Sequence, residues 1–151
     1  MEFKTATIDH LPAIVRLLAD DELGATRERF EEPLPLQYIE AFEKIMQQVG
    51  NSIIVALDNE EVIGCLQLTL IPGIARLGMT RAQIEGVRVV RSYRSKGVGE
   101  ALFRYAMDVA KANGCGMIQL TTDKQRKEAH RFYERLGFVA SHDGMKLLLS
   151  D

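Results

Sequence analysis

The stretch Arg94–Glu100 joins an apolar, β-branched run to a helical pattern, and this junction constrains the fold more than any other part of the chain. The run before it ends in Val87–Val90, and the helical pattern extends from about Gly97 to Ala112. The first N–H groups of a helix have no acceptor within the helix, and the helix dipole favours negative charge there. A glycine-containing turn between a strand and a helix N-terminus is therefore typical of an anion site. The sequence predicts that this turn binds a phosphate-bearing ligand.

Composition and charge narrow the class of protein. With 151 residues, 46% of them hydrophobic and 26% charged, the chain is predicted to form a single domain over residues 1–151. A net charge of -2 gives no field for nucleic acid, and no apolar run approaches the roughly 20 residues that span a bilayer. Cys65 and Cys115 lie in apolar runs, which indicates buried free thiols in a reducing compartment. We therefore expect a cytoplasmic protein with no metal, no nucleic-acid partner and no membrane partner.

The spacing of apolar residues predicts a mixed sheet with helices on both sides, an α/β (α+β) sandwich. The predicted order is β-α-α-β-β-β-α-β-α-β-β, and the strand–helix–strand unit around the turn predicts a parallel strand pair. Asp9 is expected to cap the first helix. Strands are expected at 3–8, 52–57, 62–71, 82–90, 117–121, 138–140 and 145–149, and helices at about 11–18, 36–49, 97–112 and 124–136.

Two motifs resemble those of a known family. Arg94-x-x-Gly97-x-Gly99, between strand and helix, resembles the Q/R-x-x-G-x-G/A signature of the GCN5-related N-acetyltransferase (GNAT) superfamily. The segment Ala129–Phe138 resembles the A-x-x-F/L-Y-x-x-x-G-F ending of that family. The predicted element order matches across nearly the whole chain and least well in residues 10–50. The resemblance implies the acyl-CoA N-acyltransferase (GNAT) fold.

The resemblance also implies a reaction and a cofactor site. It implies transfer of an acetyl group from acetyl-CoA to a primary amine of a small molecule or peptide, directly and in a ternary complex. In the family, the backbone of the turn holds the CoA pyrophosphate, and the preceding strand pairs with the pantetheine arm and diverges from its parallel neighbour. The family often dimerises, so a homodimer is a further expectation. The residues carried over are Arg94, Ser95, Lys96, Gly97, Val98, Gly99 and Glu100 for the turn, and Val87, Arg88 and Val89 for the strand.

Two residues are candidates for the chemistry. Tyr133 matches the family's tyrosine near the CoA sulfur, where a phenol hydroxyl could protonate the leaving thiolate; the alternative is a core tyrosine on a helix face. Glu85 lies where some family members place a general base, which acts directly or through a water; the alternatives are a solvated glutamate or an ion pair with a nearby arginine. Because neither cysteine has a histidine spaced to activate it, a ping-pong thiol mechanism is disfavoured.

The basic residues around the turn leave further alternatives open. Many family members carry an asparagine that contacts the CoA arm where this chain has Arg126, which either reaches a CoA phosphate or is solvated. Arg88 and Arg91 extend the basic cluster at the phosphate site, or are ordinary surface charge. The acceptor is expected between residues 20–35, residues 72–81 and the last turn. The acidic residues of 20–35 are read as a charge-mixed solvated loop, and they leave the amine unspecified.

Two other functions compete with acetyl transfer. A CoA-binding regulatory or sensor module without turnover would keep the same scaffold. A nucleotide-binding domain is poorly supported, because the turn lacks the G-x-x-x-x-G-K-[ST] pattern and Leu102 replaces the third glycine of G-x-G-x-x-G. The N-acetyltransferase is therefore the first hypothesis and the CoA-binding module the alternative.

Overall fold

The computed structural model describes residues 1–150, which form two compact units. The first is Met1–Gln119 and the second begins at Leu120. The single domain expected from the sequence stays a prediction.

The first unit is a five-stranded mixed sheet in the order β1-β2-β3-β4-β5. The first four strands pair antiparallel. Strands β4 and β5, which precede and follow α4 in the sequence, pair parallel, as predicted. The predicted α/β class is confirmed. The elements are β1 (Glu2–Thr5), the 3₁₀ turn η1 (Ile8–His10), α1 (Leu11–Ala19), η2 (Gly24–Thr26), α2 (Leu36–Gln47), β2 (Asn51–Asp58), β3 (Glu61–Ile71), α3 (Ala75–Gly78), β4 (Arg81–Val89), η3 (Arg91–Tyr93), α4 (Val98–Ala112) and β5 (Met117–Gln119).

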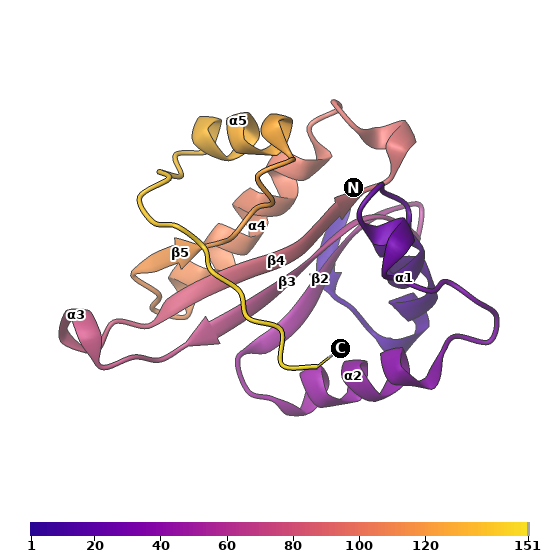
Figure 1. Cartoon of the computed structure of the whole chain (residues 1–151), viewed down its shortest axis with the longest axis horizontal. Helices are drawn as coiled ribbons and strands as arrows, with labels where there is room; N and C mark the ends of the chain where they lie inside the picture. Colours follow the sequence, from indigo (N-terminus) through magenta and orange to yellow (C-terminus); the bar gives the residue numbers. More distant parts are fainter. Residues whose placement is uncertain (151) are drawn as a thin grey trace. The chain divides into compact units, whose positions relative to one another are not determined.

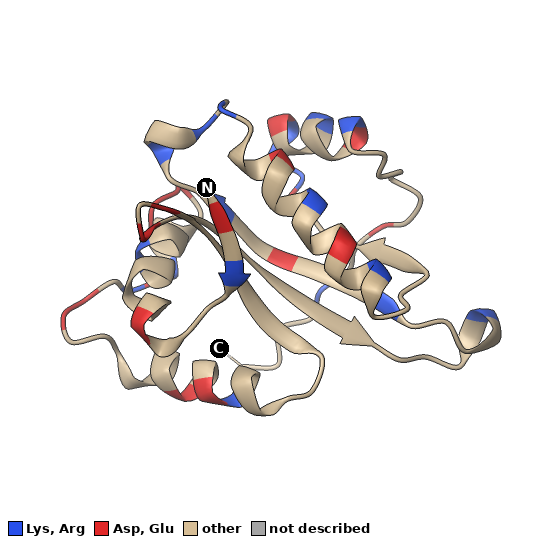
Figure 2. Ribbon diagram, turned by 180° about the vertical axis from the view of Figure 1, so that it is seen from behind, with Lys and Arg blue, Asp and Glu red and all other residues tan. Residues whose placement is uncertain are grey.

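The sheet carries helices on both faces (Figure 1). Strand residues alternate between faces, so Leu66, Leu68 and Ile84 share the face covered by α4, whose Leu102 and Phe103 are fully buried. On the opposite face, α1 and α2 form a second core with the first strands. Its members are Ala6, Leu11, Ile14, Val15, Leu17, Phe42, Val55, Leu57 and Cys65. Acidic and basic residues alternate along the outer side of α4, which marks its solvent face (Figure 2).

Strand β4 changes its pairing halfway along. Its parallel pairing with β5 covers three residue pairs and ends where Gln83 lies opposite Gln119, although β4 continues to Val89. Its register with β3 also shifts: Gln67 lies opposite Glu85, but Cys65 lies opposite Arg88. This extra residue is a β-bulge, and Gly86 within it has a φ of 64°. The bulge places Glu85 and Arg88 on the same face of the sheet, which strict alternation would not do.

The second unit differs from prediction at its end. Helix α5 (Lys127–Arg135) forms, but residues 136–150 contain neither helix nor strand, so the predicted strands 138–140 and 145–149 are absent. Strands need partners, and an isolated hairpin is marginally stable in water. Within this unit, the side chains that suggested strands are exposed, among them Val139 and Met145.

Two local features of the helices also bear on the predictions. Asp9 does not cap α1 as expected, because it lies within η1 and His10 occupies the cap position. None of the helices formed by residues 1–150 is both long enough and apolar enough to cross a membrane.

Candidate active site

The turn before α4 presents a row of backbone donors. Ser95 and Gly97 have φ angles of 63° and 83°, and the first helical bond runs from the Ala101 N–H to the Gly97 carbonyl at 3.0 Å. Within residues 1–150, no backbone carbonyl accepts from the N–H groups of residues 95–100. A Cβ built on Gly97 would meet no atom within 4 Å, so the turn is open. Such a row of N–H groups at a helix N-terminus is suited to an anion.

Two cations flank this turn. The Arg94 side chain donates from Nε to the Val89 carbonyl at 3.2 Å, and Lys96 Nζ lies 5.7 Å from the centroid of the Tyr93 ring. The Tyr93 hydroxyl donates to Asp58, and this hydrogen bond raises the pKa of the phenol. Both cationic side chains lie in exposed residues, which leaves their charge available to a ligand.

Glu85 lies on the exposed side of β4, directly opposite Gln67 on β3. It makes no ion pair with any of residues 1–150, so the predicted alternative of a pair with a nearby arginine does not occur there. It follows the last β4–β5 pair and precedes the bulge. A carboxylate therefore stands just beyond the point where the parallel pairing ends.

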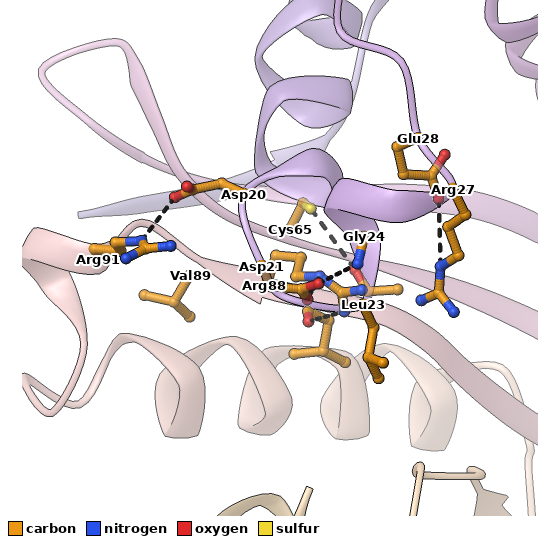
Figure 3. Close-up of polar contacts among 12 residues, drawn as sticks. Asp20, Asp21, Leu23, Gly24, Arg27, Glu28, Cys65, Arg88, Val89 and Arg91 are labelled. Atoms are coloured by element: carbon orange, nitrogen blue, oxygen red, sulfur yellow. Dashed lines mark hydrogen bonds and ion pairs between the residues drawn. The ribbon is translucent and has the colours of Figure 1, made fainter. Parts of the chain in front are cut away.

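Two adjacent aspartates tie the loop after α1 to the end of β4 (Figure 3). Arg88 Nε lies 3.0 Å from Asp21 Oδ2, and these side chains are only 14% and 13% exposed. Arg91 Nε lies 3.3 Å from Asp20 Oδ2 in a far more exposed pair. Both arginines were candidates for a phosphate-binding cluster, but the structure gives each guanidinium a carboxylate partner.

The loop that carries these aspartates is tightly built at Gly24. Asp21 Oδ1 accepts a hydrogen bond from the Gly24 N–H, and a Cβ on Gly24 would lie 1.9 Å from the Leu18 carbonyl oxygen. Only glycine fits there. Sequence reasoning missed these contacts and treated Asp20 and Asp21 as part of a solvated loop.

The cysteines are not nucleophiles. Cys65 is buried beneath the bulge, and its thiol donates to the Gly86 carbonyl at 3.8 Å. Burial raises the pKa of the Cys65 thiol to about 12, and burial also raises the pKa of Cys115. Thiolates are the reactive form, so a raised pKa lowers the reactivity of both thiols at neutral pH.

Tyr133 and Arg126 belong to the second unit. The half-buried Tyr133 packs edge-on against Phe132 and Phe138, with ring centroids 5.5 and 6.0 Å away. Arg126 is half-buried at the N-cap position of α5. The remaining candidates, Glu85, Val87–Val89 and Arg94–Glu100, lie together on β4 and the turn that follows it in the first unit.

The described residues form no metal centre, and a surface hollow lies away from this set. Residues 1–150 contain no group of three or more His, Cys, Asp or Glu side chains arranged to hold a metal ion. A surface hollow near β1 is lined by Lys4, Asp9 and Asp58 among others, and by none of the candidate residues.

Known proteins resemble this chain in sequence and in fold. It is 34% identical to the uncharacterized N-acetyltransferase YhfO of Bacillus subtilis (strain 168), over 74% of this chain and 75% of that protein. It is 37% identical to N-alpha-acetyltransferase 30 of Schizosaccharomyces pombe, over 56% of this chain but only 55% of that protein. Among solved structures, a transcriptional regulator from Bacillus halodurans C-125 matches with a TM-score of 0.96 and 48% identity, over 98% of this chain and 99% of that one.

A family model covers most of the chain as well. The model of the acetyltransferase (GNAT) family matches residues 13–138, which include both motifs and the turn. The resemblance noted in the sequence is thereby confirmed, and with it an acyltransferase as the class of enzyme at the level of the family. The chain belongs to the acetyltransferase (GNAT) family.

Proposed function

We propose that this chain transfers the acetyl group of acetyl-CoA to the primary amine of a small molecule or peptide, by direct transfer in a ternary complex. The observation that carries the proposal is the open turn at residues 95–100, whose backbone N–H groups have no backbone acceptor among residues 1–150. A pyrophosphate offers the oxygens that such a row binds. Arg94 and Lys96 stand beside it with exposed charge.

The rest of β4 suits the remainder of the cofactor. Beyond Gln83 the strand has no β5 partner, which suits an extended amide-bearing arm along Val87–Val89. The Val87 and Val89 carbonyls there already accept from the Arg88 and Arg94 side chains. Arg126 is assigned to a CoA phosphate in place of the family's asparagine. When bound, acetyl-CoA supplies an activated acetyl thioester.

Two side chains are assigned to the proton transfers. Glu85 accepts the proton that an ammonium acceptor must lose, directly or through a water. As the amine nitrogen bonds to the carbonyl carbon and the carbon–sulfur bond breaks, the Tyr133 hydroxyl donates a proton to the departing sulfur. The buried Cys65 and the half-buried Cys115 take no part, which supports direct transfer over an acyl-enzyme route.

The turn is tested by replacing Gly97 with alanine and comparing it with Gly114→Ala. Both glycines have positive φ, 83° and 78°, and a Cβ on either meets no atom within 4 Å. Backbone strain should therefore lower the stability of both variants by about 1 kcal/mol. Only Gly97→Ala should weaken acetyl-CoA binding in calorimetry, by about tenfold, because its Cβ enters the phosphate path. Equal affinities for the two variants would remove the turn as the cofactor site.

The acid is tested by Tyr133→Phe in a thiol-release assay. Loss of the phenol hydroxyl should lower kcat by about 100-fold with little change in acetyl-CoA affinity. Tyr105→Phe is the control, since the Tyr105 ring stacks on Phe3 of β1, with ring centroids 5.3 Å apart. Unchanged turnover in Tyr133→Phe would leave Tyr133 as a packing residue.

One observation favours the second function. The similar structure from Bacillus halodurans carries the description of a transcriptional regulator. A module that binds CoA without turnover would bind acetyl-CoA at the same turn but release no thiol with any amine. A panel of amines in the thiol-release assay separates the two functions. Cytoplasmic location and a homodimer stay predictions.

A further inference from the structure

The two faces of the central sheet differ in chemistry. The face under α4 is apolar and buried, with Leu66, Leu68 and Ile84 at its centre. The opposite face of the same strands carries a row of polar side chains, here called the polar strip. Its members are Asn51 on β2, Gln67 and Thr69 on β3, Gln83 and Glu85 on β4, and Gln119 on β5.

Strand register puts the whole strip on one face. Asn51 lies opposite Thr69, Gln67 opposite Glu85, and Gln83 opposite both Thr69 and Gln119. Directly paired residues point to the same side of a sheet. The strip therefore crosses four strands as one surface, within a single unit of the chain.

The side chains of the strip hold one another in place. Gln67 donates to Asn51 Oδ1 at 3.0 Å, Thr69 donates to the same oxygen at 3.3 Å, and Gln119 donates to Gln83 Oε1 at 3.1 Å. The Gln83 amide nitrogen and the Gln67 amide oxygen keep no partner among residues 1–150. The strip is thus a fixed array with spare neutral donors and acceptors, half-buried except at the exposed Glu85.

Charged residues lie at both ends of the β4 part of this face. Glu85 is the only ionised member of the strip, Arg81 lies two residues before Gln83 on the same face, and Arg88 is already paired with Asp21. Glu85 lies where β4 and β5 part. A ligand on the strip would therefore meet a carboxylate beside the proposed thioester position and neutral amides farther away.

We propose that the polar strip is the acceptor subsite and that it selects a primary amine bearing several hydroxyl groups, such as an amino sugar. This inference rests on the proposed function. The ammonium group lies against Glu85, while carboxamides, which both donate and accept, bind the hydroxyls. An apolar amine would leave those amides without partners, and a site built to bind hydroxyl groups discriminates strongly against analogues that lack them.

Glucosamine and cyclohexylamine are the test pair, since each is a six-membered ring with one primary amine. In thiol-release kinetics with acetyl-CoA, Gln83→Leu and Gln67→Leu should each raise KM for glucosamine about tenfold and leave KM for cyclohexylamine unchanged. Comparing each variant with wild type for the same amine cancels the difference in amine acidity. Gln47→Leu, at an exposed position of α2 outside the strip, is the matched control and should change neither KM.

Several results would overturn the inference while leaving acetyl transfer intact. They are an equal effect of the two variants on both amines, or a lower KM in the wild type for cyclohexylamine or for a peptide N-terminus. If none of the amines leads to thiol release, the proposed function itself is refuted. Saturation-transfer NMR of glucosamine on the protein with CoA then decides the subsite: a signal lost in Gln83→Leu supports it, and no signal in the wild type overturns it.

Discussion

At the scale of single residues, the two neighbouring aspartates after α1 should contribute differently to the stability of the fold. Asp21 and Arg88 are mostly withdrawn from water, whereas the Arg91 side chain of the Asp20 pair is 67% exposed. An exposed pair gains little because water screens it, but a buried charge that loses its partner is left without compensation. The inner pair should therefore hold the loop, and the outer pair should contribute little.

Replacing each aspartate by asparagine tests this difference. Asp21→Asn should lower the free energy of unfolding by about 3 kcal/mol, because it leaves the Arg88 guanidinium buried without a counter-charge. Asp20→Asn should cost less than about 1 kcal/mol. Urea unfolding measures both, and adding Arg88→Met to Asp21→Asn should recover part of the loss. Similar costs for the two single variants would show that burial does not separate the pairs.

At the scale of elements, the sequence correctly predicted those helices, strands and turns that depend on local sequence patterns. The β2–β3 hairpin, α4 and the turn before it follow from apolar periodicity and from Gly97 and Gly99, and all three form as expected. The bulge in β4 was not predicted, because Gly86 in an otherwise strand-like run does not reveal a register shift that only the pairing with β3 defines. The prediction of the last two strands was wrong for a similar reason. Apolar residues in 138–149 favour strands, but a strand also needs a pairing partner, which the local sequence does not reveal.

The candidate site shows the same division. The candidate anion-binding turn is a single segment, so the sequence alone could predict it, and its role stays a prediction. The contacts of Arg88 and Arg91 with the loop after α1 join residues far apart in the chain, and no periodicity reports them. The polar strip was missed because Gln67, Gln83 and Gln119 belong to three different strands and become neighbours only through the register.

At the scale of the whole molecule, a buried thiol makes the stability of the fold depend on alkaline pH. The pKa of Cys65 is raised by burial from 9.0 to about 12, so the folded state keeps a proton that the unfolded state releases above pH 9. The stabilisation is present in full below pH 9 and is lost as the pH rises toward 12.

The wild type should therefore lose about 1 kcal/mol more stability than Cys65→Ala between pH 8 and pH 10. Urea unfolding of both proteins at each pH gives this difference. The titration of lysines and tyrosines is common to both proteins and cancels. Cys115→Ala is the control, because its thiol is far less buried and the effect should be smaller. Parallel pH profiles for wild type and Cys65→Ala would contradict the assigned pKa.

Because the central strands place the apolar and polar side chains on opposite faces, substitutions on one face should leave the other face intact. The core under α4 uses Leu66, Leu68 and Ile84, and the polar strip uses the residues between them, so these two sets share a backbone but no side-chain volume. A combinatorial library that varies Gln67, Thr69, Gln83 and Gln119 should stay folded in most of its members. New acceptor preferences can then be selected without compensating mutations in the core, which makes this scaffold a good starting point for directed evolution.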